Sequence, residues 1–350
     1  MKQLKKAALA ISMMLSTSAM AAEFTFQVPH NTHPESYNHQ SLLVFKNHVE
    51  NRSNGRINVT IYPSAQMCGS AKECISGIQA GIFDYFPTTV SEVANYWKGA
   101  ESFDFPYMLP NDRVAECVYE NKTFINDVNK EFTKAAPNVR LMMVANSGGW
   151  RNFATAEKQV KSPADLKDLK MRTVPSKIQQ DLVKLYEASA SPTNFAELYI
   201  ALQTGVVDGT KNGIVDIVDS KLHETLDYII LDGHSYMAGA WVMSEKKFNS
   251  LPLELKKVVL DAVEAQQQYL MSYAKHNEYS AYKTFVKSNG QVYNPSEEEK
   301  SAFKDKSSQL IKAWEKTATS EQKQWFNRFK TEINHCTDEV AKEYDAYLGA

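Results

Sequence analysis

The side chains with the most distinctive chemistry in this sequence are four cysteines and eight scattered histidines. The cysteines are Cys68, Cys74, Cys117 and Cys336. Zinc would prefer cysteines and histidines clustered at short spacing, and only His335 stands beside a cysteine. An even number of cysteines in an exported chain favours disulfides, for which three pairings are possible. We favour Cys68–Cys74 as a short loop clip and Cys117–Cys336 as a tie to the C-terminal region, with free buried thiols as the alternative.

The motifs of common catalytic machinery are missing from the sequence. It contains no nucleophile elbow, no His-Glu-x-x-His motif, no phosphate-binding loop and no Cys-x-x-Cys pair. We therefore predict no enzyme activity, no catalytic residue, no metal ligand and no cofactor. A secreted hydrolase or lyase stays as the alternative, because a catalytic set can assemble from residues distant in sequence. Turnover of candidate acids would identify such an enzyme.

The N-terminus has the three parts of a secretory signal peptide. Three lysines among the first six residues precede an apolar stretch at 7–17, and Ala19-Met20-Ala21 forms a small-x-small cleavage site. The stretch is too short to span a bilayer, and no cysteine follows it to carry a lipid. We expect residues 1–21 to be removed and the mature protein, beginning at Ala22, to be periplasmic.

Length and charge limit the kind of partner. A chain of 350 residues, 43% of them hydrophobic, fits roughly two globular domains. The formal net charge is −2, and loss of the signal lysines makes the mature chain more negative. Such a balance does not favour nucleic acid or an anionic membrane as a partner. An anionic ligand must therefore be held by local positive groups.

The first part of the mature chain alternates between strand and helix patterns. We expect a strand at 23–28, a helix at about 36–53, a strand at 56–62, a helix at about 71–80 and an apolar segment at 82–90. Units of this length indicate an α/β fold with a mostly parallel sheet covered by helices.

The pattern restarts after Pro137. A strand at 139–144 leads to a flexible junction at Asn146-Ser147-Gly148-Gly149, which is followed by a strand at 170–174 and helices at 179–187 and 195–204. Two α/β units joined by a glycine-rich crossing indicate two lobes. The segment 253–288 has neither glycine nor proline, so it can form one helix of roughly 50 Å, long enough to cross both lobes.

Two segments carry a resemblance to a known family. They are SPADLKDLKMRT at 162–173 and ASPTNFAELYIALQTGVVDGTKN at 190–212. Together they resemble the solute-binding proteins of tripartite ATP-independent periplasmic (TRAP) transporters, the DctP family. Weaker likenesses occur at 62–66 with 81–84, at 105–107 and at 149–151. The resemblance implies a two-lobed, type II-like periplasmic binding protein with hinge strands and a long helix spanning the lobes. The lobes would comprise 22–148 plus about 238–277, and 149–237 plus about 278–350.

The resemblance also implies ligand-binding residues in the second lobe. Arg172 occupies the position of an arginine that forms a two-pronged salt bridge with the substrate carboxylate, which suits the planar fork of guanidinium donors. Arg151 matches a second arginine, Asn212 a hydrogen-bonding asparagine, and Phe195 an aromatic that packs on the ligand, although a core position for Phe195 is an alternative. Lys211 departs from the family pattern, which has glutamate there.

The first lobe is less constrained by the resemblance. The loop after the first strand would bring His30 to the cleft, and the segment after Asp84 would bring Thr88 and Thr89, with solvated loop positions as the alternative. Trp150 could form a wall of the cleft, or else pack in the hinge. Thr89 stands where some relatives carry an acid, which favours an anionic or hydroxyl-rich ligand.

The resemblance implies capture of a small organic anion and delivery to the small and large TRAP membrane subunits. Two arginines favour a carboxylate, such as a sugar acid, a keto or hydroxy acid or a C4-dicarboxylate, with sulfonates and zwitterions still open. A receptor that signals ligand to a membrane kinase is an alternative that the sequence does not separate from transport. We expect a monomer, with a dimer possible through the helical region at about 297–348.

Overall fold

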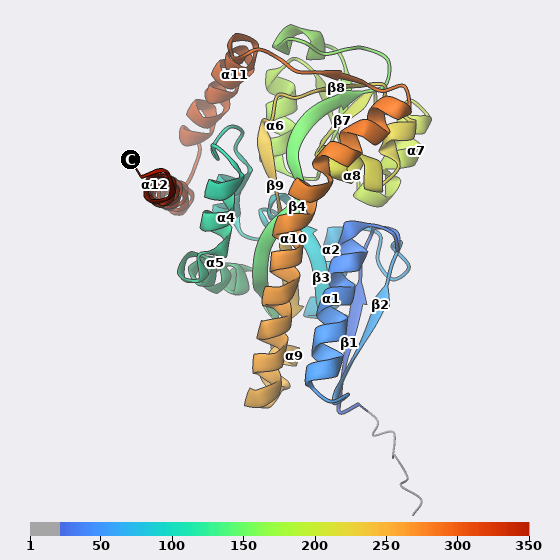
Figure 1. The fold of residues 1–350 in the computed structure, drawn as a ribbon, viewed down its shortest axis with the longest axis vertical. Coiled ribbons are helices and arrows are strands. Elements are labelled where there is room, and N and C mark those ends of the chain that lie inside the picture. Colours follow the sequence, from blue (N-terminus) through green and yellow to red (C-terminus); the bar gives the residue numbers. More distant parts are fainter. Residues whose placement is uncertain (1–21, 350) are drawn as a thin grey trace, which may run out of the picture.

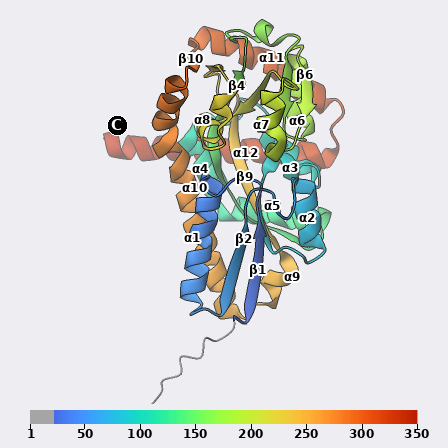
Figure 2. The same ribbon diagram turned by 90° about the vertical axis from the view of Figure 1, so that its right-hand side faces the viewer.

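The computed structural model describes residues 22–349, which form two lobes stacked along the longest axis (Figures 1 and 2). The expected signal peptide at 1–21 lies outside the described residues. The strands are β1 (Phe24–Pro29), β2 (Ile57–Tyr62), β3 (Tyr85–Thr89), β4 (Val139–Thr155), β5 (Lys170–Thr173), β6 (Ser189–Pro192), β7 (Gly209–Asn212), β8 (Tyr228–Ile230), β9 (Ser235–Ser244) and β10 (Gln291–Tyr293). The α-helices are α1 (Tyr37–Arg52), α2 (Ala71–Gln79), α3 (Val90–Val93), α4 (Asp112–Glu120), α5 (Lys122–Ala135), α6 (Lys177–Leu185), α7 (Leu198–Gln203), α8 (Ile214–Asp219), α9 (Glu245–Ser250), α10 (Leu253–Lys287), α11 (Glu297–Glu315) and α12 (Ser320–Leu348).

The lower lobe of Figure 1 is built around β1, β2 and β3, with α1 and α2 on either side of the β1–β2 pair in Figure 2. Strands β1 and β2 pair in parallel, and in their core the ring of Phe45 meets Phe26 edge to face and Tyr85 at a tilt. Helix α2 begins with a capping box, in which Ser70 and Glu73 each bond the other's backbone N–H. The alternation of strands and helices expected here is confirmed.

The expectation of a mostly parallel sheet is wrong at the centre of the molecule. Strand β9 pairs antiparallel with both β3 and β4, and β4 also pairs antiparallel with β7 and β8. The parallel pairs are β1–β2, β5–β6, β5–β7 and β8–β10. Strand β9 was not predicted from the sequence, because it is buried along its whole length and shows no polar alternation.

The junction expected at 146–149 is instead a bulge inside one continuous strand, β4. The register against β9 shifts between Asn146 and Trp150. Gly148 and Gly149 adopt positive φ angles of 119° and 90°, which favour glycine. The Asn146 side-chain oxygen accepts the N–H groups of both glycines, at 3.0 and 2.7 Å. The glycines therefore bend β4 as it passes from one lobe to the other without ending it.

The single long helix expected at 253–288 is confirmed by α10, which has 35 residues. It packs on α1 and on β4 and reaches α8 at its other end, running down much of the molecule in Figure 1. Strand β4, which packs on α10, and its partner β9 also run between the lobes. Among residues 22–349, no helix combines the length and the apolar character needed to cross a membrane.

Both favoured disulfides are present. Cys68 and Cys74 close a short loop with their Cα atoms 5.4 Å apart, and Cys117 joins Cys336 across 219 residues with a Cα separation of 5.7 Å. The second bond fastens α12 to α4. Helix α12 also packs on the 3-10 helix Lys98–Asp104, where the rings of Phe103 and Phe329 meet edge to face.

Candidate ligand-binding site

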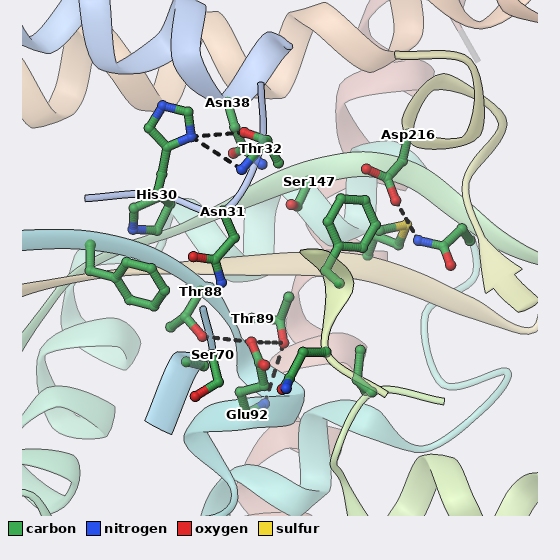
Figure 3. A pocket seen from close by; sticks show the side chains of 18 of the residues that line it. His30, Asn31, Thr32, Asn38, Ser70, Thr88, Thr89, Glu92, Ser147 and Asp216 are labelled. Carbon is green, nitrogen blue, oxygen red and sulfur yellow. Dashed lines mark hydrogen bonds between the residues drawn. The ribbon is translucent and has the colours of Figure 1, made fainter. Parts of the chain in front are cut away.

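A cavity lies between the lobes, at the ends of several strands and their following loops. Its walls mix hydroxyl, amide, charged and aromatic groups. The lining residues are His30, Asn31, Thr32, Tyr37, Asn38, Ser70, Ala71, Phe86, Pro87, Thr88, Thr89, Glu92, Ser147, Arg151, Arg172, Val174, Asn194, Phe195, Asn212, Asp216 and Met237. Ligands of α/β proteins bind at such strand ends. Figure 3 shows Glu92 grouped with Thr88 and Thr89, and Asp216 away from them.

Arg172 is one of the largest fully buried side chains, with 2% of its surface exposed. It stands on β5, where its Nε donates to the backbone oxygen of Thr193 at 3.0 Å. Its guanidinium lies 5.8 Å from the ring centre of Phe195. The two terminal nitrogens donate no hydrogen bond to any described residue, so the fork of donors remains available on the side of the cavity.

Arg151 is 4% exposed and comes from β4, two strands away in the same sheet. One terminal nitrogen donates to the backbone oxygen of Lys211 at 2.9 Å. Within residues 22–349, neither this guanidinium nor that of Arg172 forms an ion pair with a carboxylate. Burial lowers the pKa of both arginines, and repulsion from Arg151 contributes to lowering that of Arg172 to about 10. Both groups therefore stay charged at neutral pH, close together and, among residues 22–349, without a carboxylate in direct ion-pair contact.

Two acids line the same cavity, Asp216 buried and Glu92 half-buried, and sequence reasoning missed both. Glu92 accepts the hydroxyls of Thr88 at 2.8 Å and Thr89 at 3.4 Å, and Asp216 accepts the side-chain amide of Asn212. Burial raises the pKa of each carboxyl, to about 6 for Asp216, although both arginines oppose the shift. The available signals were weak: Glu92 follows Thr89 at the spacing of a helix cap, and Asp216 follows Asn212 by one helical turn.

Asn212, at the end of β7, is held by its neighbours. Its side-chain oxygen accepts the Thr210 hydroxyl at 2.8 Å while its nitrogen donates to Asp216. An amide has two donor hydrogens and two acceptor positions, so one of each remains after these contacts. The expected hydrogen-bonding role of Asn212 is compatible with this geometry.

His30 lines the cavity, but both of its ring nitrogens are engaged within the protein. One bonds the hydroxyl of Thr32 and the other the ring of His39, each at 2.9 Å. Burial, with repulsion from the neighbouring histidines, lowers the pKa of His30 to about 3. The ring is therefore neutral at pH 7 and adds no positive charge to the site. Thr89 both lines the cavity and caps α3, accepting the N–H of Glu92 at 3.3 Å.

Trp150 does not line this cavity, which corrects the expectation that it forms a cleft wall. Its indole N–H donates to Asp112 at 2.9 Å, and its ring packs edge to face on Tyr236. Successive side chains of a strand point to opposite faces, so Arg151 faces the cavity while Trp150 faces away. The alternative of hinge packing describes Trp150 better.

Lys211, where the family pattern has glutamate, also points away from the cavity. Its ammonium donates to both oxygens of Gln179, and the amide of Gln179 donates to Asp104 at 2.6 Å. Asp104 also accepts the hydroxyls of Ser91 and Ser176. Burial lowers the pKa of Lys211 to about 7. The lysine that replaces the family's glutamate is thus held by a buried hydrogen-bond network that joins α3 to α6 outside the cavity lining.

Comparison with known proteins places the chain in a family. Residues 28–317 match the model of the bacterial extracellular solute-binding protein family 7, DctP. The 2,3-diketo-L-gulonate-binding periplasmic protein YiaO of Escherichia coli is 25% identical over 73% of this chain and 76% of its own. The C4-dicarboxylate-binding periplasmic protein DctP of Rhodobacter capsulatus is 24% identical over 77% and 79%.

The fold is also that of solved relatives. A TRAP periplasmic solute-binding protein of Anaerococcus prevotii, solved with D-glucuronate, superposes with a TM-score of 0.82 at 21% identity, over 89% of this chain and 99% of that one. The two-lobed α/β architecture is therefore shared along nearly the whole described chain. The protein belongs to the bacterial extracellular solute-binding protein family 7, the DctP family of TRAP solute-binding proteins, whose members bind small organic solutes and are not enzymes.

Proposed function

We propose that this protein captures a small carboxylate in the periplasm and delivers it to the small and large membrane subunits of a TRAP transporter. The observation that carries the proposal is the pair of buried guanidinium groups, Arg172 and Arg151, that line the cavity without a carboxylate partner among the described residues. Burying a charge is costly unless it is paired. A ligand carboxylate bound to the free fork of Arg172 supplies that partner.

The geometry of Arg172 supports a two-pronged contact. Its Nε is already bonded to Thr193, which fixes the plane of the guanidinium. The two terminal nitrogens then present parallel donors that match the two oxygens of a carboxylate. Phe195 lies against the same guanidinium and offers an apolar surface to the ligand carbon chain. Arg151 adds positive charge from the neighbouring part of the sheet.

We further propose a hinged clamp with the expected lobe division, 22–148 plus about 238–277 and 149–237 plus about 278–350. Crossing segments β4, β9 and α10 would act as the hinge, with α12 reaching back onto α4. Contacts of one ligand with protein groups on both sides of the cavity would favour the closed form, because closure removes these charged contacts from water. The proposed location in the periplasm is supported by the signal-like sequence of residues 1–21 and by membership in a family of extracellular solute-binding proteins.

A thermal-shift screen of the mature protein, residues 22–350, tests the proposal. A ligand that binds only the folded state stabilises it by RT ln(1 + [L]/Kd), about 4 kcal/mol at a thousandfold excess over Kd. We expect one or a few small carboxylates to raise the unfolding temperature while uncharged analogues, such as the corresponding amides, do not. Equal shifts by the acids and their amides would reject a site built on arginine.

The affinity for a carboxylate is expected to increase as the pH falls from 8 to 5. Protonation of Asp216, whose pKa is raised to about 6, removes a negative charge near the arginines, and Lys211 gains its full charge below about 7. The removal of one nearby like charge should strengthen binding by about tenfold or more. Titration calorimetry across this range, with an acid whose own pKa lies below 4, measures the effect.

The variant Asp216→Asn is the control for this pH dependence. It removes the titrating carboxyl and keeps an amide of the same shape, so its affinity should vary less than that of the wild type between pH 7 and 5. An affinity that falls with acidification in the wild type would contradict the electrostatic account of the site.

A further inference from the structure

We infer that the ligand is a monocarboxylate with hydroxyl groups at its far end, and that Glu92 selects it over dicarboxylates of the same skeleton. This inference rests on the proposed function, because it takes the carboxylate at Arg172 as given. Glu92 follows the end of β3 in the proposed first lobe, while the arginines come from β4 and β5 in the proposed second lobe. A ligand that bridges the cavity would meet the arginines at one end and Glu92 at the other.

The Glu92 carboxylate is not used as a helix cap. Thr89 caps α3, where its hydroxyl accepts the backbone N–H of Glu92. In a capping box the Glu92 carboxylate would in turn accept the backbone N–H of Thr89. That return bond is not formed. Oε2 accepts instead the hydroxyls of Thr88 and Thr89, and Oε1 accepts no hydrogen bond from any residue in the described range. The carboxylate therefore keeps an acceptor for a donor in the cavity.

The charges around Glu92 make a second ligand carboxylate unfavourable at this end. Within residues 22–349, the lining contains no lysine and no third arginine, and His30 is neutral. Arg151 and Arg172 are close enough together that each repels the other's charge, so both serve the same end of the ligand. A distal carboxylate would lie beside Glu92, where, among the described residues, the only cations that act are the two arginines that already bind the other end of the ligand. A like charge at such a position is strongly disfavoured.

Hydroxyl groups suit the rest of the lining. Asn31, Asn38, Thr32 and Ser147 offer donors and acceptors within one cavity, as Figure 3 shows. A ligand hydroxyl can donate to Oε1 of Glu92 and accept from such a neighbour. A ligand ammonium could also donate to Glu92, but the positive charges of the two arginines would repel it. Their field reaches Glu92, because it opposes the rise in the pKa of the Glu92 carboxyl that burial causes.

Matched ligand pairs test the inference. D-Gluconate and D-glucarate differ only in the terminal group, CH₂OH against a second carboxylate, and D-erythronate and meso-tartrate repeat the comparison with four carbons. Calorimetric titration of the mature protein should favour at least one monocarboxylate over its dicarboxylate partner by about 100-fold. In Glu92→Gln, which keeps the shape and removes the charge, the ratio should fall at least about tenfold. The exposed Glu157→Gln serves as the matched control and should leave the ratio unchanged.

Several outcomes would overturn the inference. A dicarboxylate that binds the wild type as tightly as its partner, a ratio unaffected by Glu92→Gln, or a zwitterion such as ectoine that outcompetes both monocarboxylates would each do so. Unfolding temperatures of the unliganded variants verify that they are folded. If dicarboxylates bind tightly and need Arg172, the proposed function stands and only the role of Glu92 fails. If small carboxylates bind equally well without Arg172, the proposed function itself fails.

Discussion

Arg172→Ala is expected to lose about 2–5 kcal/mol of carboxylate binding, which would remove measurable affinity for a micromolar ligand. The variant takes away both prongs of the contact and leaves Arg151 alone against a buried anion. The unliganded variant should unfold at the wild-type temperature or above it, because Arg172 is a buried charge that forms no direct ion pair with any described residue. Titration calorimetry with a ligand from the screen, together with thermal unfolding, measures both effects.

Two further variants sharpen this result. Arg172→Lys keeps the charge but has no planar fork, so its affinity should lie between those of the wild type and Arg172→Ala. Arg113→Ala removes an exposed arginine that pairs with Glu343 far from the cavity, and its affinity should equal that of the wild type. Unchanged affinity in Arg172→Ala would show that the arginine plays no part in binding.

Removal of the Cys117–Cys336 disulfide is expected to have the largest effect on stability. The bond closes a loop of 219 residues, and the loop-entropy relation gives about 5.4 kcal/mol for a cross-link of that span. Cys117→Ser with Cys336→Ser should therefore lower the free energy of unfolding by about that amount, measured by denaturant titration. Helix α12 would also lose its covalent attachment to α4, although its packing on the 3-10 helix Lys98–Asp104 remains.

The other disulfide provides the matched control. Cys68 and Cys74 are six residues apart, and the same relation gives only about 2 kcal/mol for so short a loop. Cys68→Ser with Cys74→Ser should thus destabilise the protein less than loss of Cys117–Cys336. The reverse order would show that local packing around the short loop outweighs the restriction of the unfolded chain.

Much of the fold could be predicted from local patterns. The alternation of 23–28 and 56–62, the helices expected at about 36–53 and 71–80 and the unbroken helical segment 253–288 all depend on neighbouring residues. Strand β9 escaped prediction because a strand buried on both faces has no polar alternation. The glycines of β4 predicted a break, whereas pairing with β9 on both sides of the bulge keeps the strand continuous.

The site was only partly predictable, for physical reasons. Arg172, Arg151, Asn212, Phe195, Thr89 and His30 line one cavity, although their contacts with a ligand stay predictions. Glu92 and Asp216 were missed because an acidic residue in a short helix usually signals a solvated face or a cap. Trp150 was misplaced because adjacent residues of a strand point in opposite directions, which sequence proximity to Arg151 conceals.

A crystal structure of the mature protein with the best ligand of the screen tests the central claim most directly. The account predicts the ligand in the cavity between the lobes, with its carboxylate oxygens 2.7–2.9 Å from the terminal nitrogens of Arg172, the range typical of charge-assisted bonds. A carboxylate turned away from both arginines would contradict the account. So would a ligand bound elsewhere, for example in the groove between Tyr107 and Lys300.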